Sequence, residues 1–363
     1  MESLLHWLAL KTVPGVGNRL FLHLIQHFGD PKKVFSASIE QLVQVEGVNA
    51  RLASVIQGYK IPGKVQEDLS LAEKNGIRII TFSDPSYPTL LRHISDPPPV
   101  LYVYGTLQAD SLNIAVVGSR NATTYGRTIT ERLSGDLVQR GFTVVSGMAR
   151  GIDAAAHKGA LAARGKTIAV LGCGLDTIYP AENKRLFHQI AESGAVISEF
   201  PCLTPPEAHN FPVRNRIISG LALGTVIVEA TQKSGSLITA RLAAEQGREV
   251  FAVPGSITSF KSMGTHRLIK QGAKLVEHVN DIIDELNIDQ LIPPTGGNEK
   301  PGIPLTLEEK RLLNELSPYP VHIDKLVQHL SLSAAQVSSL LLQLELKGLV
   351  TQSPGKLFTR CDP

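Results

Sequence analysis

Three stretches of the sequence decide the expected fold: IAVVGSRNATTYG at residues 114–126, TVVSGMARGIDAAAHKGAL at 143–161 and TIAVLGCG at 167–174. Each opens with a short run rich in Val and Ile, which is typical of a strand buried on both faces of a sheet. Glycine or serine follows each run at once, and the first two stretches continue into a helical pattern. Strands and helices that alternate in this way predict a parallel, doubly wound α/β sheet of the Rossmann-like type.

The same alternation extends over residues 66–287, which we expect to form one extended Rossmann-like domain. The expected strands are 77–82, 101–104, 114–117, 143–145, 167–171, 195–198, 225–228 and 249–253. The expected helices are 125–140, 152–164, 183–193, 214–221, 236–246 and 265–270.

The loops that follow the strands are the first candidates for a binding site, because ligands of open parallel sheets bind at the carboxyl ends of the strands. Glycine there admits a ligand to the backbone, Ser supplies a hydroxyl group, and the next helix presents free N–H groups to an anion. Several such loops with cations suit a chain of phosphates better than one phosphate. Alternatively, these turns need Gly and Ser only for tight geometry and helix caps. The candidates are Gly118, Ser119, Arg120, Ser146, Gly147, Arg150, Gly151, Lys184, Lys233, Ser234, Gly235 and Ser236.

The segment HNFPVRNR at residues 209–216 combines two arginines, two amides and an aromatic ring just before an expected helix. Arg and Asn contact phosphates and base edges, and Phe stacks on bases. We therefore add Phe211, Arg214, Asn215 and Arg216 to the candidate DNA-binding residues. The alternative is an ordinary loop with a buried Phe.

Signatures of common enzymes are missing from the sequence. There is no GxGxxG fingerprint, no GxxxxGK[ST] phosphate-binding loop and no GxSxG nucleophile turn. Asp153 and His157 share a helix face, but a capping Asp and a packed His are the commoner arrangement. We expect no catalytic residue, no metal site and no cofactor.

Composition limits the class of protein and its location. The 363 residues carry 36 Lys+Arg and 33 Asp+Glu, so the net charge is only +3 and any nucleic-acid site depends on local charge placement. The three cysteines have no metal-ligand spacing, and an odd number suits a reducing compartment. There is neither a basic, signal-like start nor an 18-residue apolar run. These features predict a cytoplasmic protein without a membrane span.

An internal repeat marks residues 1–65 as a separate helical domain. LKTVPGVGNRL at 10–20 aligns without gaps on LVQVEGVNARL at 42–52, and six of the eleven positions are identical. Each copy predicts a helix, a tight turn and a second helix, with Gly15 and Gly17 allowing positive φ and Asn49 standing in place of Gly17. The two copies resemble the tandem helix-hairpin-helix motifs of a SAM-like domain. The backbone N–H groups of such turns can face a DNA phosphate. The alternative is that the turns serve only packing, which is favoured by Glu46 in the second turn because its charge would repel a phosphate.

The C-terminal part begins after a Pro/Gly-rich linker at residues 288–304. Residues 305–363 predict three helices and a β-hairpin, the pattern of a winged helix. The third helix, SAAQVSSLLLQLELK, has no basic residue before Lys347, so we expect weak duplex binding and a role in protein contacts or regulation. A weak contact of the wing with DNA through Lys356 and Arg360 is the alternative.

The central motifs resemble those of the DprA/Smf family of bacterial DNA-processing proteins. The match runs in order through residues 115–126, 146–161, 167–186, 210–221 and 229–256. The resemblance implies a homodimer that binds single-stranded DNA, protects incoming DNA and loads the RecA recombinase in natural transformation, without catalysis. It implies that Arg120 contacts DNA, that Gly147, Gly151 and Ser234–Ser236 line the phosphate path, and that Phe211 stacks on a base. Lysines found in some members are replaced here by Ala181 and Ala208.

Two other functions compete with this expectation. Nucleotide hydrolases of the LOG phosphoribohydrolase type share the Rossmann-like fold, but their PGGxGTxxE loop corresponds here to KSGSLITA at 233–240, without an acid. Glu229, just before that loop, is the remaining catalytic candidate. A pure protein scaffold is the third alternative, and it would leave the cationic loops unexplained.

Overall fold

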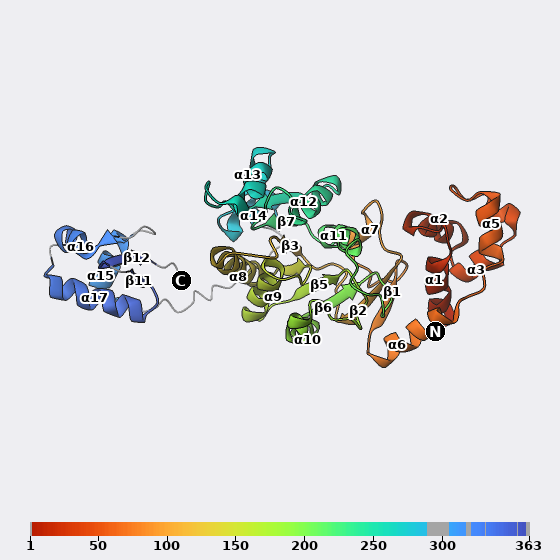
Figure 1. Ribbon diagram of the computed structural model, residues 1–363, viewed down its shortest axis with the longest axis horizontal. Coiled ribbons are helices and arrows are strands. Elements are labelled where there is room, and N and C mark those ends of the chain that lie inside the picture. The colour runs from red at the N-terminus through yellow and green to blue at the C-terminus, as the bar shows by residue number, and fades with distance from the viewer. Residues whose placement is uncertain (1, 289–304, 317–320, 331, 354, 361–363) are drawn as a thin grey trace. The chain divides into compact units, whose positions relative to one another are not determined.

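A computed structural model describes residues 2–288, 305–316, 321–330, 332–353 and 355–360. The chain forms two compact units, Met1–Pro293 and Pro294–Pro363 (Figure 1). The expected linker at 288–304 lies, apart from Ile288, outside the described residues. Within the described ranges, no helix combines the length and apolar character needed to cross a bilayer.

A nine-stranded sheet in the order β1-β2-β6-β5-β4-β3-β7-β8-β9 organises the larger unit. Strands β3 to β9 pair in parallel, which confirms the expected mostly parallel sheet. From β3, the strands β4, β5 and β6 follow one another toward one edge of the sheet, and β7, β8 and β9 follow one another toward the other edge. The direction in which successive strands are added therefore reverses between β3 and β7. The strands are β1 (Arg78–Thr81), β2 (Val100–Gly105), β3 (Asn113–Val117), β4 (Thr143–Ser146), β5 (Thr167–Leu171), β6 (Ala195–Ser198), β7 (Gly224–Ile227), β8 (Glu249–Ala252) and β9 (Lys274–Leu275).

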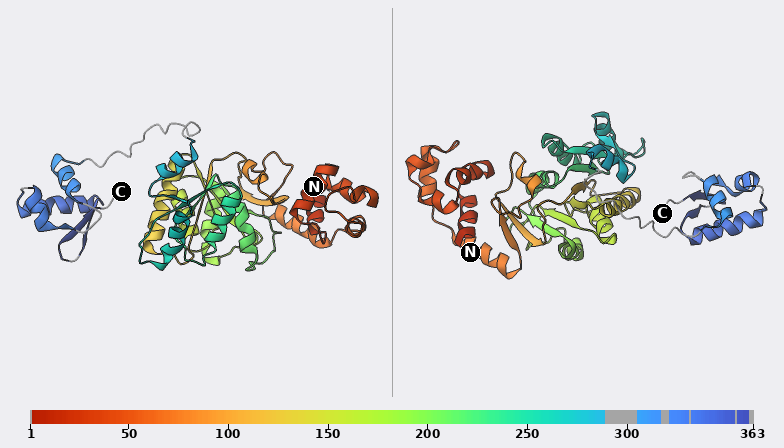
Figure 2. Two further views of the ribbon diagram at one scale, coloured as in Figure 1. Left: turned by 90° about the horizontal axis from the view of Figure 1, so that it is seen from above. Right: turned by 180° about the vertical axis from the view of Figure 1, so that it is seen from behind.

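Helices cover both faces of this sheet (Figure 2). Successive side chains of a strand point to opposite faces. Ile114 and Val116 pack in one core with α8 (Thr124–Gln139), α9 (Ile152–Ala162) and α14 (Val279–Leu286). Ala115 and Val117 pack in another with α7 (Thr89–Arg92), α11 (Asn210–Gly220) and α12 (Ser236–Glu245). This two-sided burial explains why the strands are continuously apolar. The remaining elements are η1 (Ala181–Asn183), α10 (Lys184–Ser193), η2 (Phe260–Ser262) and α13 (Met263–Lys270).

Several features of this unit differ from the expectation, among them β9 and α14, which no expected range covers. Strand β1, at the edge of the sheet, is antiparallel to β2, and β2 is antiparallel to β6. Helix α11 begins at Asn210, four residues before the expected start at 214, so the segment from Phe211 to Arg216 is helical and does not precede the helix. That shift decides which of its side chains share a face.

The N-terminal repeat folds as two matching hairpins. Gly15 and Gly47, equivalent in the repeat, both have φ +91°. A methyl group on Gly15 would lie 3.2 Å from Leu52, and one on Gly47 would lie 3.4 Å from Leu20, so each turn packs on the equivalent leucine of the other copy. The helices are α1 (Glu2–Thr12), α2 (Asn18–Phe28), α3 (Pro31–Ser36), α4 (Ile39–Leu42), α5 (Ala50–Gln57) and α6 (Gly63–Lys74).

The expectation of positive φ at the second turn position was wrong. Gly17 has φ −82° and Asn49 has φ −94°, because each is the N-cap of the following helix. The Asn49 side chain accepts a hydrogen bond from the Leu52 N–H at 2.9 Å. Asn18, at the start of α2, donates to the carboxylate of Asp96 at 3.5 Å, so an acid lies against the first turn. With Glu46 in the second turn, both turns are poor places for a phosphate.

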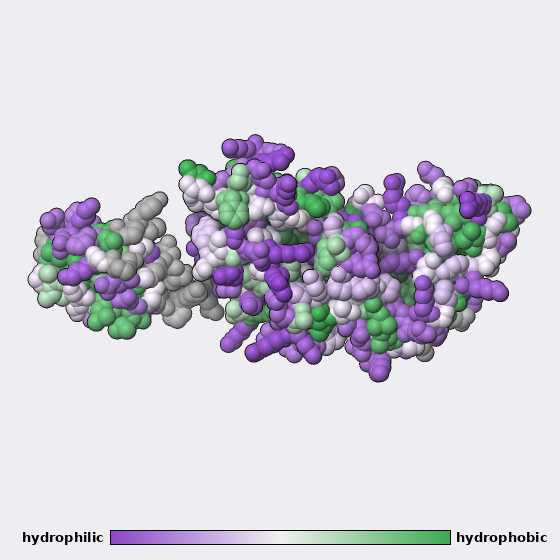
Figure 3. Space-filling view, in the orientation of Figure 1, coloured by the Kyte–Doolittle hydropathy of each residue, from purple (hydrophilic) through white to green (hydrophobic). Residues whose placement is uncertain are grey.

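The C-terminal unit is a winged helix, as expected. It consists of three helices and a small sheet in the order β10-β12-β11. Its third helix carries no basic residue, and Lys347 just beyond it forms an ion pair with buried Glu309 at 2.6 Å. Figure 3 shows hydrophobic surface over this helix, where Leu342 and Leu346 are exposed. The elements are α15 (Leu307–Glu315), β10 (Val321–His322), α16 (Ile323–Leu330), α17 (Ala334–Leu346), β11 (Val350–Ser353) and β12 (Leu357–Arg360).

Candidate nucleic-acid interface

A hollow of about 720 Å³ opens at the carboxyl ends of β3 and β7, where the strand order reverses. Three of the expected loops, those after β3, β4 and β7, line it together with one face of α11. Nine of the candidate residues meet here: Gly118, Ser119, Arg120, Phe211, Arg214, Asn215, Ser234, Gly235 and Ser236. Figure 3 shows hydrophilic side chains gathered over the larger unit at the level of β3 and β7.

Arg120 is the exposed cation of this hollow. Its guanidinium carbon lies 5.3 Å above the centre of the Phe211 ring. Among the described residues, none forms an ion pair with Arg120. Its charge is therefore available to an anion, while the ring beneath it offers a face for stacking.

Arg214 is placed differently, because its side chain is buried below the hollow. It donates from Nη1 to the carbonyl oxygens of Gly147, at 2.8 Å, and of Val170. Burial lowers its pKa to about 10, which still leaves the guanidinium charged at neutral pH. Nearby Asp153 is also buried, and burial raises its pKa. Arg214 thus joins β4, β5 and α11, and supplies positive potential from beneath the site.

Two candidate glycines are required by packing within the protein itself. A methyl group on Gly147 would lie 2.6 Å from the Asp153 carboxylate and 2.7 Å from Nη1 of Arg214. Gly151 has φ +74°, and a methyl group there would lie 2.2 Å from the Ser119 carbonyl oxygen. The Ser146 hydroxyl is buried and donates to the Val116 carbonyl at 2.6 Å. These residues hold the loops together behind the surface.

A second, smaller hollow of about 200 Å³ adjoins the first. It is lined by Gly147 and Arg150, and it shares Arg120 and Phe211 with the larger hollow. Arg150 forms an exposed ion pair with Glu182 at 2.8 Å. The loop after β4 therefore contributes its cation next to the loop after β3.

The loop after β7 presents hydroxyl groups at the start of α12. The Ser234 and Ser236 hydroxyls lie 2.8 Å apart, and the Ser236 N–H donates to the Ser234 hydroxyl at 3.4 Å. Lys233 is exposed and lines an adjoining hollow between α12 and α13. This loop therefore presents the hydroxyl groups that its sequence predicts, at the start of a helix.

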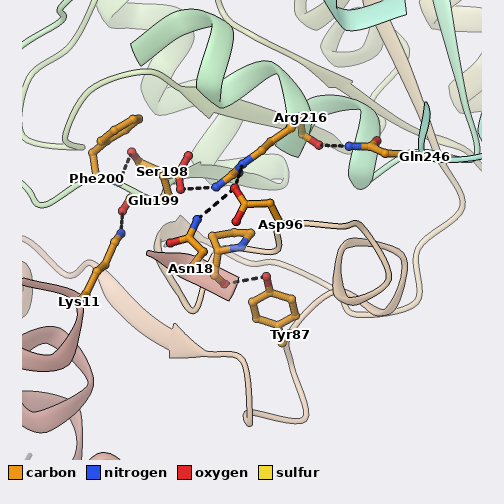
Figure 4. Close-up of polar contacts among 10 residues, drawn as sticks. Lys11, Asn18, Tyr87, Asp96, Ser198, Glu199, Phe200, Arg216 and Gln246 are labelled. Carbon is orange, nitrogen blue, oxygen red and sulfur yellow. Dashed lines mark hydrogen bonds and ion pairs between the residues drawn. The ribbon is translucent and has the colours of Figure 1, made fainter. Parts of the chain in front are cut away.

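Two candidate residues lie away from the hollows. Lys184 is exposed at the start of α10 and lines neither of them. Arg216 is buried and bonds Glu199 at 2.6 Å and Asp96 at 3.0 Å, beside Lys11 and Asn18 of the N-terminal helices (Figure 4). Two residues along a helix lie about 200° apart around its axis, so Arg214 and Arg216 of α11 face opposite ways.

The hollows also contain residues that were not predicted from the sequence. Asn121 lines both hollows, Phe260 and Lys261 line the larger one, and Tyr179 lines the smaller one. Lys261 was detectable in principle, because it follows the expected strand 249–253, whose carboxyl end lies at the same sheet edge. It was not predicted because it lies several residues beyond the end of that strand.

Glu229, the catalytic candidate of the hydrolase alternative, has a structural role. It is buried and accepts hydrogen bonds from the Thr123 N–H, at 3.0 Å, and from the Thr123 hydroxyl. His157 is also buried, with Nδ1 2.7 Å from the Thr167 hydroxyl. Over the described residues, no cluster of three or more His, Cys, Asp or Glu side chains is arranged to hold a metal ion.

Comparison with known families identifies the chain. The model of the family described as DNA recombination-mediator protein A matches residues 78–287, and that of the DprA winged helix domain matches residues 297–356. The chain belongs to the DprA/Smf family. Protein Smf of Synechocystis is 38% identical to this DprA/Smf protein over 98% of both chains. Protein Smf of Escherichia coli is 42% identical over 86% of this chain and 85% of its own.

Solved structures of DprA proteins share the fold. That of DNA processing protein A from Streptococcus pneumoniae has a TM-score of 0.67 and 34% identity, over 78% of this chain and 98% of its own. That of DNA processing protein A from Helicobacter pylori, described for its single-stranded DNA binding mode, has a TM-score of 0.52 and 31% identity. It covers 59% of this chain and 98% of its own.

Proposed function

We propose that this DprA/Smf protein binds single-stranded DNA across the hollow at the ends of β3 and β7. The observation that carries the proposal is the pairing of exposed Arg120 with the Phe211 ring at the point where the strand order reverses. A cation over an aromatic face suits a strand that offers both a phosphate and an unpaired base. The single-stranded DNA binding of the Helicobacter relative supports the same assignment.

The finer parts of the proposal follow the family resemblance. We infer a cytoplasmic homodimer that protects incoming DNA and loads RecA in transformation and recombination, without enzymatic activity of its own. Light scattering tests the dimer, and RecA assembly on oligo(dT) in the presence of the protein tests loading. The hydrolase alternative is not favoured, because Glu229 is buried and engaged with Thr123.

The decisive experiment is the charge reversal Arg120→Glu. We expect oligo(dT) affinity to fall at least about tenfold, since the variant removes one phosphate contact and adds repulsion. The slope of log affinity against log salt should also decrease by about 0.7, the value for one phosphate on a single strand. Fluorescence anisotropy over a salt series measures both.

Arg132→Glu is the matched control, because Arg132 is exposed on α8 and lines neither hollow. It makes the same change in net charge. Wild-type affinity in a folded Arg120→Glu protein, or an equal loss in the control, would reject the site. A wild-type affinity that does not respond to salt would indicate a small ligand instead.

A further inference from the structure

Phe211 lies at the junction of the two hollows. The larger hollow and the smaller one share Arg120, Asn121, Ala149 and Phe211. They are thus two parts of one continuous surface, with the Phe211 ring and the Arg120 guanidinium between them. A strand that contacts Phe211 has room on both sides of it.

Each hollow has a second aromatic side chain of its own. Tyr179 lines only the smaller hollow, and its ring centre lies 5.6 Å from that of Phe211 at an interplanar angle of 45°. Phe260 lines only the larger one. Tyr179 is 42% exposed and Phe260 is 64% exposed, so neither ring is used in a core. The three rings come from three separate segments of the chain, and Phe211 shares one hollow with each of the other two.

A cation accompanies each ring. The Lys261 ammonium lies 5.9 Å from the centre of the Phe260 ring, and the Arg120 guanidinium lies 5.3 Å from that of Phe211. Arg150 lines the smaller hollow together with Tyr179. Each hollow therefore holds aromatic rings together with cations, and a single strand offers bases to the rings and phosphates to the cations.

The turn that carries Phe260 is anchored although the ring is exposed. The Lys261 carbonyl accepts a hydrogen bond from the Ala230 N–H at 2.8 Å, and the Ser259 hydroxyl accepts one from the Lys261 N–H at 3.3 Å. Ser262, two residues on, is buried. A fixed backbone that holds an apolar ring in solvent favours binding, because the ring loses little freedom when a base stacks on it.

We propose that Tyr179, Phe211 and Phe260 form a row of three stacking positions for bases of one DNA strand. Arg150, Arg120 and Lys261 face the phosphates of the same strand. The inference rests on the proposed function and extends it from one stacking residue to a path across both hollows. Paired bases of a duplex do not offer their faces to such rings, so the row selects single strands.

The test compares Tyr179→Ala and Phe260→Ala with wild type on two probes of equal length, oligo(dT) and an abasic oligomer with the same phosphates. Base–aromatic stacking is worth enough that each variant should lose about 5- to 150-fold in oligo(dT) affinity. Affinity for the abasic oligomer should stay within about twofold of wild type. Tyr179→Phe and Phe260→Tyr keep a ring and should bind oligo(dT) like wild type.

Controls separate this inference from the proposed function. Ile257→Ala truncates an exposed apolar side chain in the same loop as Phe260 and should bind both probes like wild type. If the two alanine variants bind oligo(dT) normally while Arg120→Glu does not, the row is wrong and the site stands. Equal losses on both probes would show a structural effect and also overturn the row. If Arg120→Glu binds normally, the proposed function itself fails.

Discussion

At the residue scale, side chains in the same loops divide between holding the protein together and facing solvent. Gly147 leaves room for the Asp153 carboxylate and the Arg214 guanidinium, and Gly151 lets the loop after β4 meet the backbone of Ser119. Arg120, in contrast, is exposed, and its guanidinium lies over the Phe211 ring. In these loops a few exposed side chains therefore stand on a tightly packed base.

His157 gives a prediction for the pH dependence of stability. Burial lowers its pKa to about 3, and its Nε2 has no partner among the described residues. Its ordinary pKa is about 6.5, so the unfolded chain binds a proton between these values and the folded chain does not. The neutral His157 side chain therefore contributes its full share of the free energy of unfolding above pH 6.5, and this share is lost as the pH falls toward 3. By pH 5 the loss is about 2 kcal/mol.

The variant His157→Gln should show a flatter loss of stability between pH 7 and pH 5 than wild type. Urea unfolding followed by circular dichroism at the two pH values measures the free energy of unfolding. The difference between the two proteins in the slope of unfolding free energy against pH removes the effect of the other titrating groups, which both proteins share. Equal slopes in the two proteins would mean that His157 is protonated in the folded state.

At the scale of elements, the register of α11 assigns the two arginines to different tasks. The helix turns Phe211, Arg214, Asn215 and Ile218 toward the hollow, with the spacing of one helical face. Arg216 falls on the other side and bonds Glu199 and Asp96 next to the N-terminal helices (Figure 4). One helix therefore positions the Phe211 ring at the hollow and also joins the sheet to the N-terminal helices.

Arg216→Ala should separate these two tasks. It leaves two carboxylates without their cation, one of them buried, so the free energy of unfolding should fall by about 3–5 kcal/mol. The oligo(dT) affinity of the folded protein should stay within twofold of wild type. Arg241→Ala, which removes an exposed arginine paired with Glu245 at 3.5 Å, should cost less than about 0.5 kcal/mol. Loss of DNA binding without loss of stability would contradict this assignment.

At the scale of the whole molecule, the cations around the hollows and the winged-helix motif that usually binds DNA lie in different units. The winged helix has the element that usually enters the major groove, but α17 carries no Lys or Arg and exposes Leu342 and Leu346. The sheet unit instead gathers Arg120, Arg150 and Lys261 around its hollows. A protein-contact or regulatory role for the winged helix is consistent with this division.

Lys356→Glu in the wing should therefore change affinity for duplex and single-stranded DNA by less than about twofold. The same change at Lys233, beside the hydroxyl-rich loop after β7, should weaken oligo(dT) binding several-fold by removing a phosphate contact. Anisotropy titrations with both DNA forms measure the two variants under identical conditions. A large loss of duplex binding in Lys356→Glu alone would make the winged helix a DNA-binding domain.

Much of the fold followed from local pattern. The expected strands, the turn at Gly15 and the winged helix agree with the structure, because each depends on residues near one another in sequence. The loops after β3 and β7 were also assigned to one site, since parallel strands bring their carboxyl ends to one edge. The family motifs added Arg120 and Phe211 with specific roles.

The tertiary structure alone decided which side chains face the site. Helix α11 starts four residues earlier than expected, which brings Phe211 onto the same helical face as Arg214. Arg216 is buried in an ion pair with Glu199, and Lys184 lines neither hollow. Tyr179, Phe260 and Lys261 reach the site from loops whose paths no local pattern specifies. The physical reason is that burial and direction depend on the packing of distant segments, whereas strand and helix formation depend on neighbours along the chain.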